Sequence, residues 1–219
     1  MNNHYEEWVI PTYIINLQER KERRKHIEQQ FVDKPEFEVN FVEAVKHQKG
    51  NIGLWKSLCN VIHTAMERNE DIICVCEDDH FFTPYYHREI LFSNIIEANQ
   101  QGADFLSCGI AGFGNVVPVG NNRYWVDSLL STQMIIIFEP LFQRILEYDF
   151  QDDDAEDLVI SKLSNAKQVI FPFISIQKDF GYSDVTEIHN QHQGIVQKMF
   201  QQSFARLSMI HHIYHKYKN

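Results

Sequence analysis

A short apolar run that ends in three consecutive carboxylates constrains this chain more than any other feature of its sequence. Residues 72–76 read Ile-Ile-Cys-Val-Cys, and Glu77, Asp78 and Asp79 follow them directly. An unbroken run of this length, rich in β-branched residues, is typical of a strand buried on both faces, as in parallel sheets covered by helices. Because open α/β sheets bind ligands at the carboxyl ends of their strands, we expect the carboxylates at a ligand-binding edge.

Three neighbouring carboxylates repel one another, and a cation placed between their oxygens relieves this repulsion. Hard divalent cations prefer oxygen ligands, so Mn²⁺ or Mg²⁺ is the expected ion and Asp79 the first choice for a direct ligand. A divalent ion at a sheet edge indicates a phosphate-bearing substrate. The alternative, a solvated acidic turn that binds nothing, stays open at this point.

The composition indicates a single domain that is made and kept in the cytoplasm. A chain of 219 residues is long enough for one substantial core. No apolar run reaches membrane-spanning length, and residues 1–7 lack a signal-peptide pattern. The four cysteines lack zinc-site or C-x-x-C spacing and are expected to be free thiols. The net charge of -10 argues against general nucleic-acid binding.

Strands alternate with helices early in the chain, which predicts an α/β fold: a mostly parallel mixed sheet with helices on both faces. Strands are expected at residues 12–17, 37–42, 72–76, 103–107, 134–138 and, as one or two strands, within 168–176. Helices are expected at residues 19–31, 53–68, 85–99, 140–146, 155–163 and 194–217. A glycine-rich stretch, residues 109–122, is expected to be a loop near the cleft.

The carboxyl-terminal segment, residues 194–219, differs in charge from the rest of the chain. It carries several lysine, arginine and histidine residues, and no Asp or Glu follows Glu187. Its apolar residues keep helical spacing, which predicts an amphipathic basic helix. Two interpretations remain open. The helix packs on the domain or on a second copy in a homodimer, or it lies on the inner face of an anionic membrane near a lipid-linked acceptor.

Several short motifs occur in order between residues 12 and 186. They are Ile15-Asn16-Leu17 with Arg23-Arg24, Val42-Glu43-Ala44, Gly50-Asn51-Ile52-Gly53 with Ser57, Glu77-Asp78-Asp79, and Ser183-Asp184-Val185. Together they resemble the pattern of glycosyltransferase family 25, the lipopolysaccharide-type and procollagen-type transferases. Two positions depart from that pattern: Leu58 stands where the family usually has histidine, and Gln18 where aspartate is common.

The resemblance implies a single GT-A-like catalytic domain over residues 1–193. It also implies a metal-dependent hexosyltransferase with a nucleotide-sugar donor, expected to be a UDP-sugar. The acceptor would be a glycan or lipid-linked glycan in lipopolysaccharide or capsule biosynthesis, and the reaction is expected to invert the anomeric centre. The matching motifs place three further residues among the donor-binding candidates: Leu17, Gly50 and Ser57.

The same resemblance implies roles for the acidic triplet. Asp78 would lie near the donor ribose, and Glu77 would reach the metal through water or orient its other ligands. A late metal or phosphate ligand is also common in such chains, and His189 is the main candidate here, beside His192 and Asp184.

Three polar residues after the first strand are donor-binding candidates from their position alone. Arg23 and Arg24 follow that strand and could reach a donor phosphate or nucleobase. The alternative is a solvated helix face, because they belong to a run of charged residues. Asn16 ends the strand, where its amide could meet the base.

The acceptor hydroxyl of an inverting transferase needs a general base. Residues 154–163 resemble the acidic pair that opens a helix in many inverting GT-A enzymes. Asp157 is the expected base, and Glu156 its neighbour or an acceptor ligand. The alternative is that the acidic residues at this helix start, Asp152 to Asp154 among them, only cap the helix.

Two other functions stay open on the sequence. One is a non-catalytic nucleotide-sugar or glycan-binding module of the same fold, which the leucine at position 58 keeps in consideration. The other is a sugar nucleotidyltransferase. Such enzymes usually carry a glycine-rich loop after the first strand, and the absence of glycine from residues 18–25 disfavours it.

Overall fold

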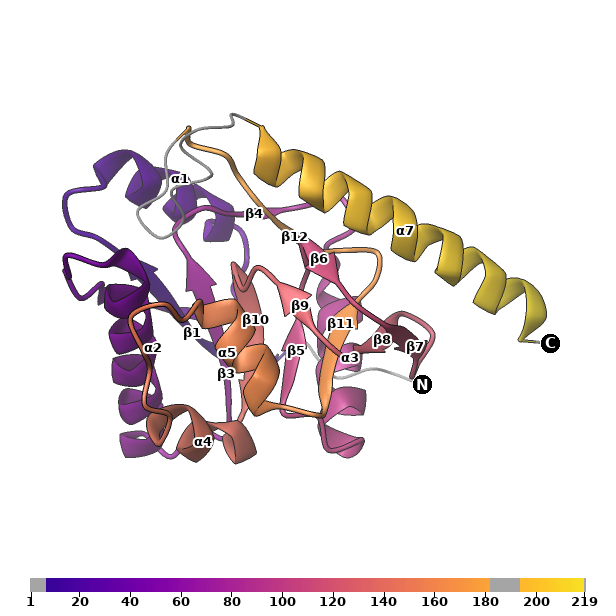
Figure 1. Cartoon of the computed structure of the whole chain (residues 1–219), viewed down its shortest axis with the longest axis horizontal. Helices are drawn as coiled ribbons and strands as arrows, with labels where there is room; N and C mark the ends of the chain where they lie inside the picture. Colours follow the sequence, from indigo (N-terminus) through magenta and orange to yellow (C-terminus); the bar gives the residue numbers. More distant parts are fainter. Residues whose placement is uncertain (1–6, 182–193, 219) are drawn as a thin grey trace.

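The computed structural model describes residues 7–181 and 194–218 and is built around one eight-stranded sheet (Figure 1). The sheet order is β2 (Phe37–Glu43), β1 (Ile10–Asn16), β3 (Ile72–Glu77), β10 (Met134–Phe138), β5 (Phe105–Ser107), β11 (Lys167–Ile170), β8 (Arg123–Val126) and β7 (Val116–Pro118). Two small sheets pair β4 (His80–Phe82) with β12 (Ser175–Gln177) and β6 (Gly112–Phe113) with β9 (Leu129–Leu130).

The sheet is mixed, as predicted. Strand β1 lies parallel to both β2 and β3, whereas β10 runs antiparallel to β3 and β5, and β8 antiparallel to β11 and β7. All other strands therefore share one direction. In the register of β1 and β3, Ile15 lies opposite Glu77, so the carboxyl ends of both strands meet at one edge. This pairing places Asn16 beside the acidic triplet.

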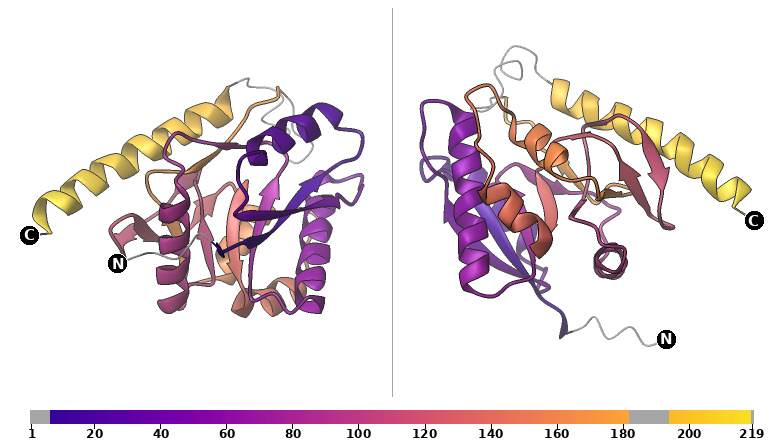
Figure 2. Two further views of the ribbon diagram at one scale, coloured as in Figure 1. Left: turned by 180° about the vertical axis from the view of Figure 1, so that it is seen from behind. Right: turned by 60° about the horizontal axis from the view of Figure 1, so that its bottom comes forward.

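Helices cover both faces of the sheet, because successive strand residues point to opposite sides. In β3, Ile73 and Val75 belong to one hydrophobic cluster, and Cys74 and Cys76 to the other. The first cluster is covered by α2 (Gly50–Glu67), α4 (Phe142–Leu146), α5 (Glu156–Leu163) and α7 (Ile195–Tyr217), and the second by α1 (Lys21–Phe31) and α3 (Arg88–Gln100), as Figure 2 shows from two sides. The four cysteines are free thiols, as expected.

The glycine-rich stretch departs from its prediction as a loop. It contains β6 and β7, which pair with β9 and β8. Residues of this stretch form short strands because their backbone N–H and C=O groups pair with strands that lie later in the chain.

Helix α7 is present as predicted, and its first half packs on the domain. Val196, Phe200 and Leu207 are buried in the first hydrophobic cluster. Its second half also contacts the domain, since His211 hydrogen-bonds with the hydroxyl of Tyr124 (2.7 Å), and it exposes Met209 and Ile213. The packing on the domain matches one of the two interpretations, while membrane contact and a homodimer stay predictions. In the described part of the chain, no helix is long and apolar enough to cross a bilayer.

Helix α2 begins so close to the loop at residues 44–49 that one glycine is required. A Cβ added at Gly53 would lie 2.4 Å from the carbonyl oxygen of Val45. Ser57, one turn later, donates to the Gly53 carbonyl (2.7 Å) and accepts from the Val45 N–H (2.8 Å). The loop is thus held against the helix by contacts that leave no room for a side chain.

We predict that Gly53→Ala lowers the free energy of unfolding by about 1–3 kcal/mol, since the methyl group overpacks a backbone contact. Urea denaturation measures the change. Lys56→Ala, on the exposed side of the same helix, should change the free energy by no more than about 0.5 kcal/mol. A Gly53→Ala protein that is more stable than the wild type would show that helix propensity outweighs the close contact.

Candidate functional site

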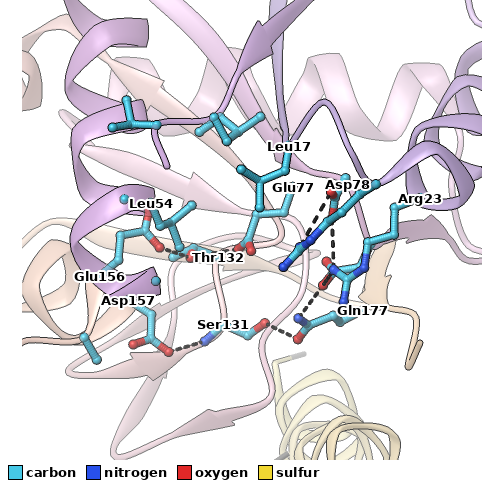
Figure 3. Close-up of a pocket in the computed structure, with 18 of the residues that line it drawn as sticks. Leu17, Arg23, Leu54, Glu77, Asp78, Ser131, Thr132, Glu156, Asp157 and Gln177 are labelled. Carbon is cyan, nitrogen blue, oxygen red and sulfur yellow. Dashed lines mark hydrogen bonds and ion pairs between the residues drawn. The ribbon is translucent and has the colours of Figure 1, made fainter. Parts of the chain in front are cut away.

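A cleft of about 740 Å³ opens at the edge where β1 and β3 end. Its walls include the end of β1 with the start of α1, the loop at residues 44–48 with the start of α2, and the acidic triplet. Residues 130–132, the start of α5, Gln177 and the start of α7 complete most of the lining. Eight of the residues predicted from sequence line it: Leu17, Arg23, Gly50, Glu77, Asp78, Asp79, Glu156 and Asp157. Figure 3 shows most of these side chains.

Asp78 is held by its neighbours on both carboxylate oxygens. The amide of Asn16 donates to one oxygen at 2.8 Å, and the guanidinium of Arg23 donates to the other at 3.0 Å. Arg20 lies 3.8 Å away. Asn16 does not line the cleft and instead lies behind Asp78, so its predicted contact with a nucleobase stays a prediction.

Asp79 is held on one oxygen only. Its Oδ2 accepts from Gln177 (2.8 Å) and from Arg23 (3.3 Å). Its Oδ1 is buried and finds no hydrogen-bond partner among the described residues. Burial raises the pKa of Asp79 to about 6 even though Arg23 lies beside it. Asp79 therefore keeps an unused acceptor at the cleft.

Two further acidic residues, Glu156 and Glu77, line the same cleft as Asp78 and Asp79. Glu156 is buried and accepts from the hydroxyl of Thr132 at 2.6 Å. Burial raises the pKa of Glu156 to about 7. Burial also raises the pKa of Glu77 well above its ordinary value, and the charges of Asp79 and Glu156 add to that rise. The carboxylate of Glu77 thus experiences the negative charges of both Asp79 and Glu156.

Asp157 has a different environment. Its two oxygens accept from the backbone N–H groups of Ser131 and Leu158, each at 2.8 Å. Helix capping by the preceding acidic residues is absent: the N-cap is Ala155, and Asp154 accepts instead from Gln151 and Tyr148. Asp154 thus binds donors of its own loop, whereas Asp152 pairs with Lys49.

Several predicted residues lie away from the cleft. Arg24 pairs with Glu28 on the exposed face of α1 and lies over the ring of Phe41, so the solvated alternative describes it. Ser57 is buried and holds the loop at residues 44–48, and Leu58 lies in the core. Trp55, Tyr124 and Trp125, aromatic residues of the kind that can stack on a sugar or base, do not line the cleft either. His189, with His192 and Asp184, falls outside the described residues.

Residues that sequence reasoning missed connect the two acidic groups. Ser131, Thr132 and Gln177 all line the cleft and hydrogen-bond its carboxylates (Figure 3). Ser131 and Thr132 precede β10. The sequence predicted this strand but not whether it runs parallel or antiparallel to its neighbours. Because β10 runs antiparallel to β3, its beginning lies at the edge where β3 ends.

The acidic residues of the cleft are of the chemical type that binds a divalent cation. They offer oxygen ligands, and Asp79 Oδ1 is a buried acceptor without a partner in the described part of the structure. No group of three His, Cys, Asp or Glu side chains within residues 7–181 and 194–218 forms a complete metal site.

Comparison with known protein families agrees with this site. Residues 9–64, which contain β1, α1, β2 and most of α2, match the family described as "Glycosyltransferase family 25 (LPS biosynthesis protein)". This segment of the chain is thus similar to that family. The resemblance seen in the sequence motifs is thereby confirmed. No curated protein is similar enough to the chain to count as a match.

Solved structures extend the comparison to most of the chain. A197 from STIV is 11% identical, with a TM-score of 0.52 over 80% of this chain and 87% of that one. A glycosyltransferase involved in the glycosylation of the major capsid of PBCV-1 is 10% identical over 75% and 82% (TM-score 0.48). UDP-glucose pyrophosphorylase complexed with UDP-glucose is 9% identical over 84% and 98% (TM-score 0.47). At these identities the likeness concerns the fold alone, and only the first score exceeds 0.5. The predicted α/β fold class, a mixed sheet with helices on both faces, is confirmed.

We predict that Arg23→Met lowers the free energy of unfolding by about 3–5 kcal/mol, because it leaves two buried carboxylates without their cation. Urea denaturation at pH 7 measures the loss. Arg24→Met is the matched control one residue later, and removing its exposed ion pair should cost no more than about 1 kcal/mol. Equal losses in the two variants would contradict the role given to Arg23.

Proposed function

We propose that this protein is a metal-dependent, inverting glycosyltransferase that moves a sugar from a UDP-sugar to a glycan or lipid-linked glycan of the cell surface. One observation carries the proposal. Two acidic pairs, Glu77 with Asp79 and Glu156 with Asp157, line a single cleft in a chain whose first segment matches a sugar-transferase family. A donor diphosphate needs a cation on one side, and an acceptor hydroxyl needs a base on the other.

The donor side would hold the diphosphate. Glu77 and Asp79 would hold Mn²⁺ or Mg²⁺, which when bound stabilises the negative charge of the departing diphosphate as a Lewis acid. Arg20 and Lys46 line the same side and add positive charge to the cleft. Arg23 keeps Asp78 and Asp79 in place by hydrogen bonds to both. The donor therefore meets groups that are already positioned before it binds.

The acceptor side would supply the base. The acceptor hydroxyl gives its proton to Glu156 while its oxygen bonds to the anomeric carbon, and the bond from that carbon to the diphosphate oxygen breaks. Asp157 was the expected base, but both of its oxygens accept backbone N–H groups. Burial raises the pKa of Glu156 to about 7, close to neutrality, which suits a general base. Asp157 instead holds the backbone of Ser131 by accepting a hydrogen bond from its N–H.

We predict that UDP with Mn²⁺ raises the thermal unfolding temperature of the protein, because both ligands bind only the folded state. Asp79→Asn should abolish this rise, since it removes a carboxylate from the ion. Asp153→Asn, which changes an exposed carboxylate that does not line the cleft, should leave the rise unchanged. Differential scanning fluorimetry with a panel of nucleoside diphosphates and metals measures the effect.

Three outcomes would count against the proposal in different ways. If no nucleoside diphosphate stabilises the protein in the presence of metal, the proposed donor site is wrong. Binding without sugar transfer or donor hydrolysis, across a panel of nucleotide sugars, would indicate a non-catalytic binding module. Formation of a nucleotide sugar from a sugar phosphate and a nucleoside triphosphate would indicate a nucleotidyltransferase.

We predict that turnover increases with pH through about 7, because Glu156 must be ionised to accept a proton and its pKa is about 7. Glu156→Gln should reduce turnover by about 10²–10⁴-fold, the usual contribution of a general base. Transfer rates at saturating substrate from pH 5 to pH 9 test both effects. A midpoint near 4.5, the ordinary value for a glutamate, would contradict the role of Glu156.

The same shift can be measured without a substrate. A carboxyl whose pKa is raised on folding binds more protons in the folded state between its two pKa values. Its contribution to stability is therefore greatest at low pH and is lost as pH rises from about 4.5 through about 7. The difference in unfolding free energy between wild type and Glu156→Gln should follow this course.

A further inference from the structure

The turn between β9 and β10 has an unusual backbone. Ser131 has a φ of 81°, and the only other non-glycine residue of the described chain with a positive φ is Asn69. Asn69 follows the end of α2, where asparagine commonly takes this conformation. Ser131 follows a strand and has no such reason. A conformation of this kind persists where surrounding contacts hold it, and it often marks a functional site.

Ser131 contacts residues on both sides of the cleft. Its N–H donates to Asp157 Oδ2 at 2.8 Å. Its hydroxyl donates to Gln133 (2.8 Å) and lies 3.4 Å from Oε1 of Gln177, whose amide donates to Asp79 Oδ2 at 2.8 Å. The positive φ directs the N–H and the side chain to these opposite partners at once. Ser131 thus connects Asp157 on α5 with Asp79 beyond β3.

Thr132 makes the parallel connection. Its hydroxyl donates to Glu156 Oε2 at 2.6 Å and lies 3.5 Å from Glu77 Oε1. The residue is buried, so this short hydrogen bond is shielded from water. Two consecutive residues of one turn therefore contact both acidic pairs (Figure 3).

We propose that Thr132 is a positioning residue for Glu156, and that the Ser131–Thr132 turn sets the spacing between the donor side and the acceptor side of the cleft. The inference rests on the proposed function, because it assigns Glu156 the role of base. A hydrogen bond to Oε2 fixes the carboxylate and leaves Oε1 for the acceptor hydroxyl. Among the described residues, none donates to Oε1. An error of about 1 Å in such a group can cost about 10² in rate.

Thr132→Val and Thr132→Ser form a matched pair that tests the role. Valine keeps the shape and removes the hydroxyl, whereas serine keeps the hydroxyl and removes the methyl group. We expect Thr132→Val to reduce kcat by about 10–100-fold with the donor KM within about twofold of the wild type. Thr132→Ser should stay within about threefold in both constants. Thr132→Ala replaces the valine variant should that one not fold.

Crystal structures of the same variants separate this inference from the proposed function. We expect the Glu156 carboxylate to keep its position in the wild type and in Thr132→Ser, and to leave it in Thr132→Val. An unmoved Glu156 in Thr132→Val overturns the positioning role even where transfer occurs, and so does an equal loss of kcat in both variants. A moved Glu156 in a protein that transfers no sugar supports the positioning of this side chain and overturns only the proposed function.

Discussion

The contact between Arg23 and the carboxylates of Asp78 and Asp79 is the interaction on which the rest of the site depends. All three side chains are nearly inaccessible to solvent. Removing a carboxylate from water costs several kcal/mol, and this cost is offset only where a cation and hydrogen bonds replace the lost water. Arg23 supplies the cation from the first turn of α1, while Asn16 and Gln177 supply the hydrogen bonds. Helix α1 is thereby joined to the edge of the sheet by charge as well as by packing.

The cleft nevertheless keeps an excess of negative charge. Six of its lining residues are acidic, and three are lysine or arginine, of which Lys46 already pairs with Glu19. Burial raises the pKa values of Glu77, Asp79 and Glu156, and the charges of neighbouring carboxylates add to each rise. Protons or a bound cation can relieve this excess of negative charge. The proposed function therefore assigns a divalent cation to this cleft.

Part of this arrangement could be read from the sequence. The buried run before Glu77 indicated a central strand, and the position of acidic residues at its end indicated the binding edge. The helical spacing of α2 and α7 was equally clear, because local periodicity depends on residues that are close in the chain. By contrast, nothing local distinguished Arg23 from Arg24. Neighbouring side chains on a helix point in directions about 100° apart, so docking of α1 decides which one faces the carboxylates.

The sequence by itself determined the order of the main strands and helices, the acidic end of β3 and the likeness of the first segment to a known family. Only the tertiary structure decided which groups complete the site. The antiparallel direction of β10 brings Ser131 and Thr132 to the edge where β3 ends, and α5 brings Glu156 opposite Glu77. These contacts join residues more than twenty positions apart. They arise from the pairing of strands and the packing of helices on the sheet, which no local pattern of residues records.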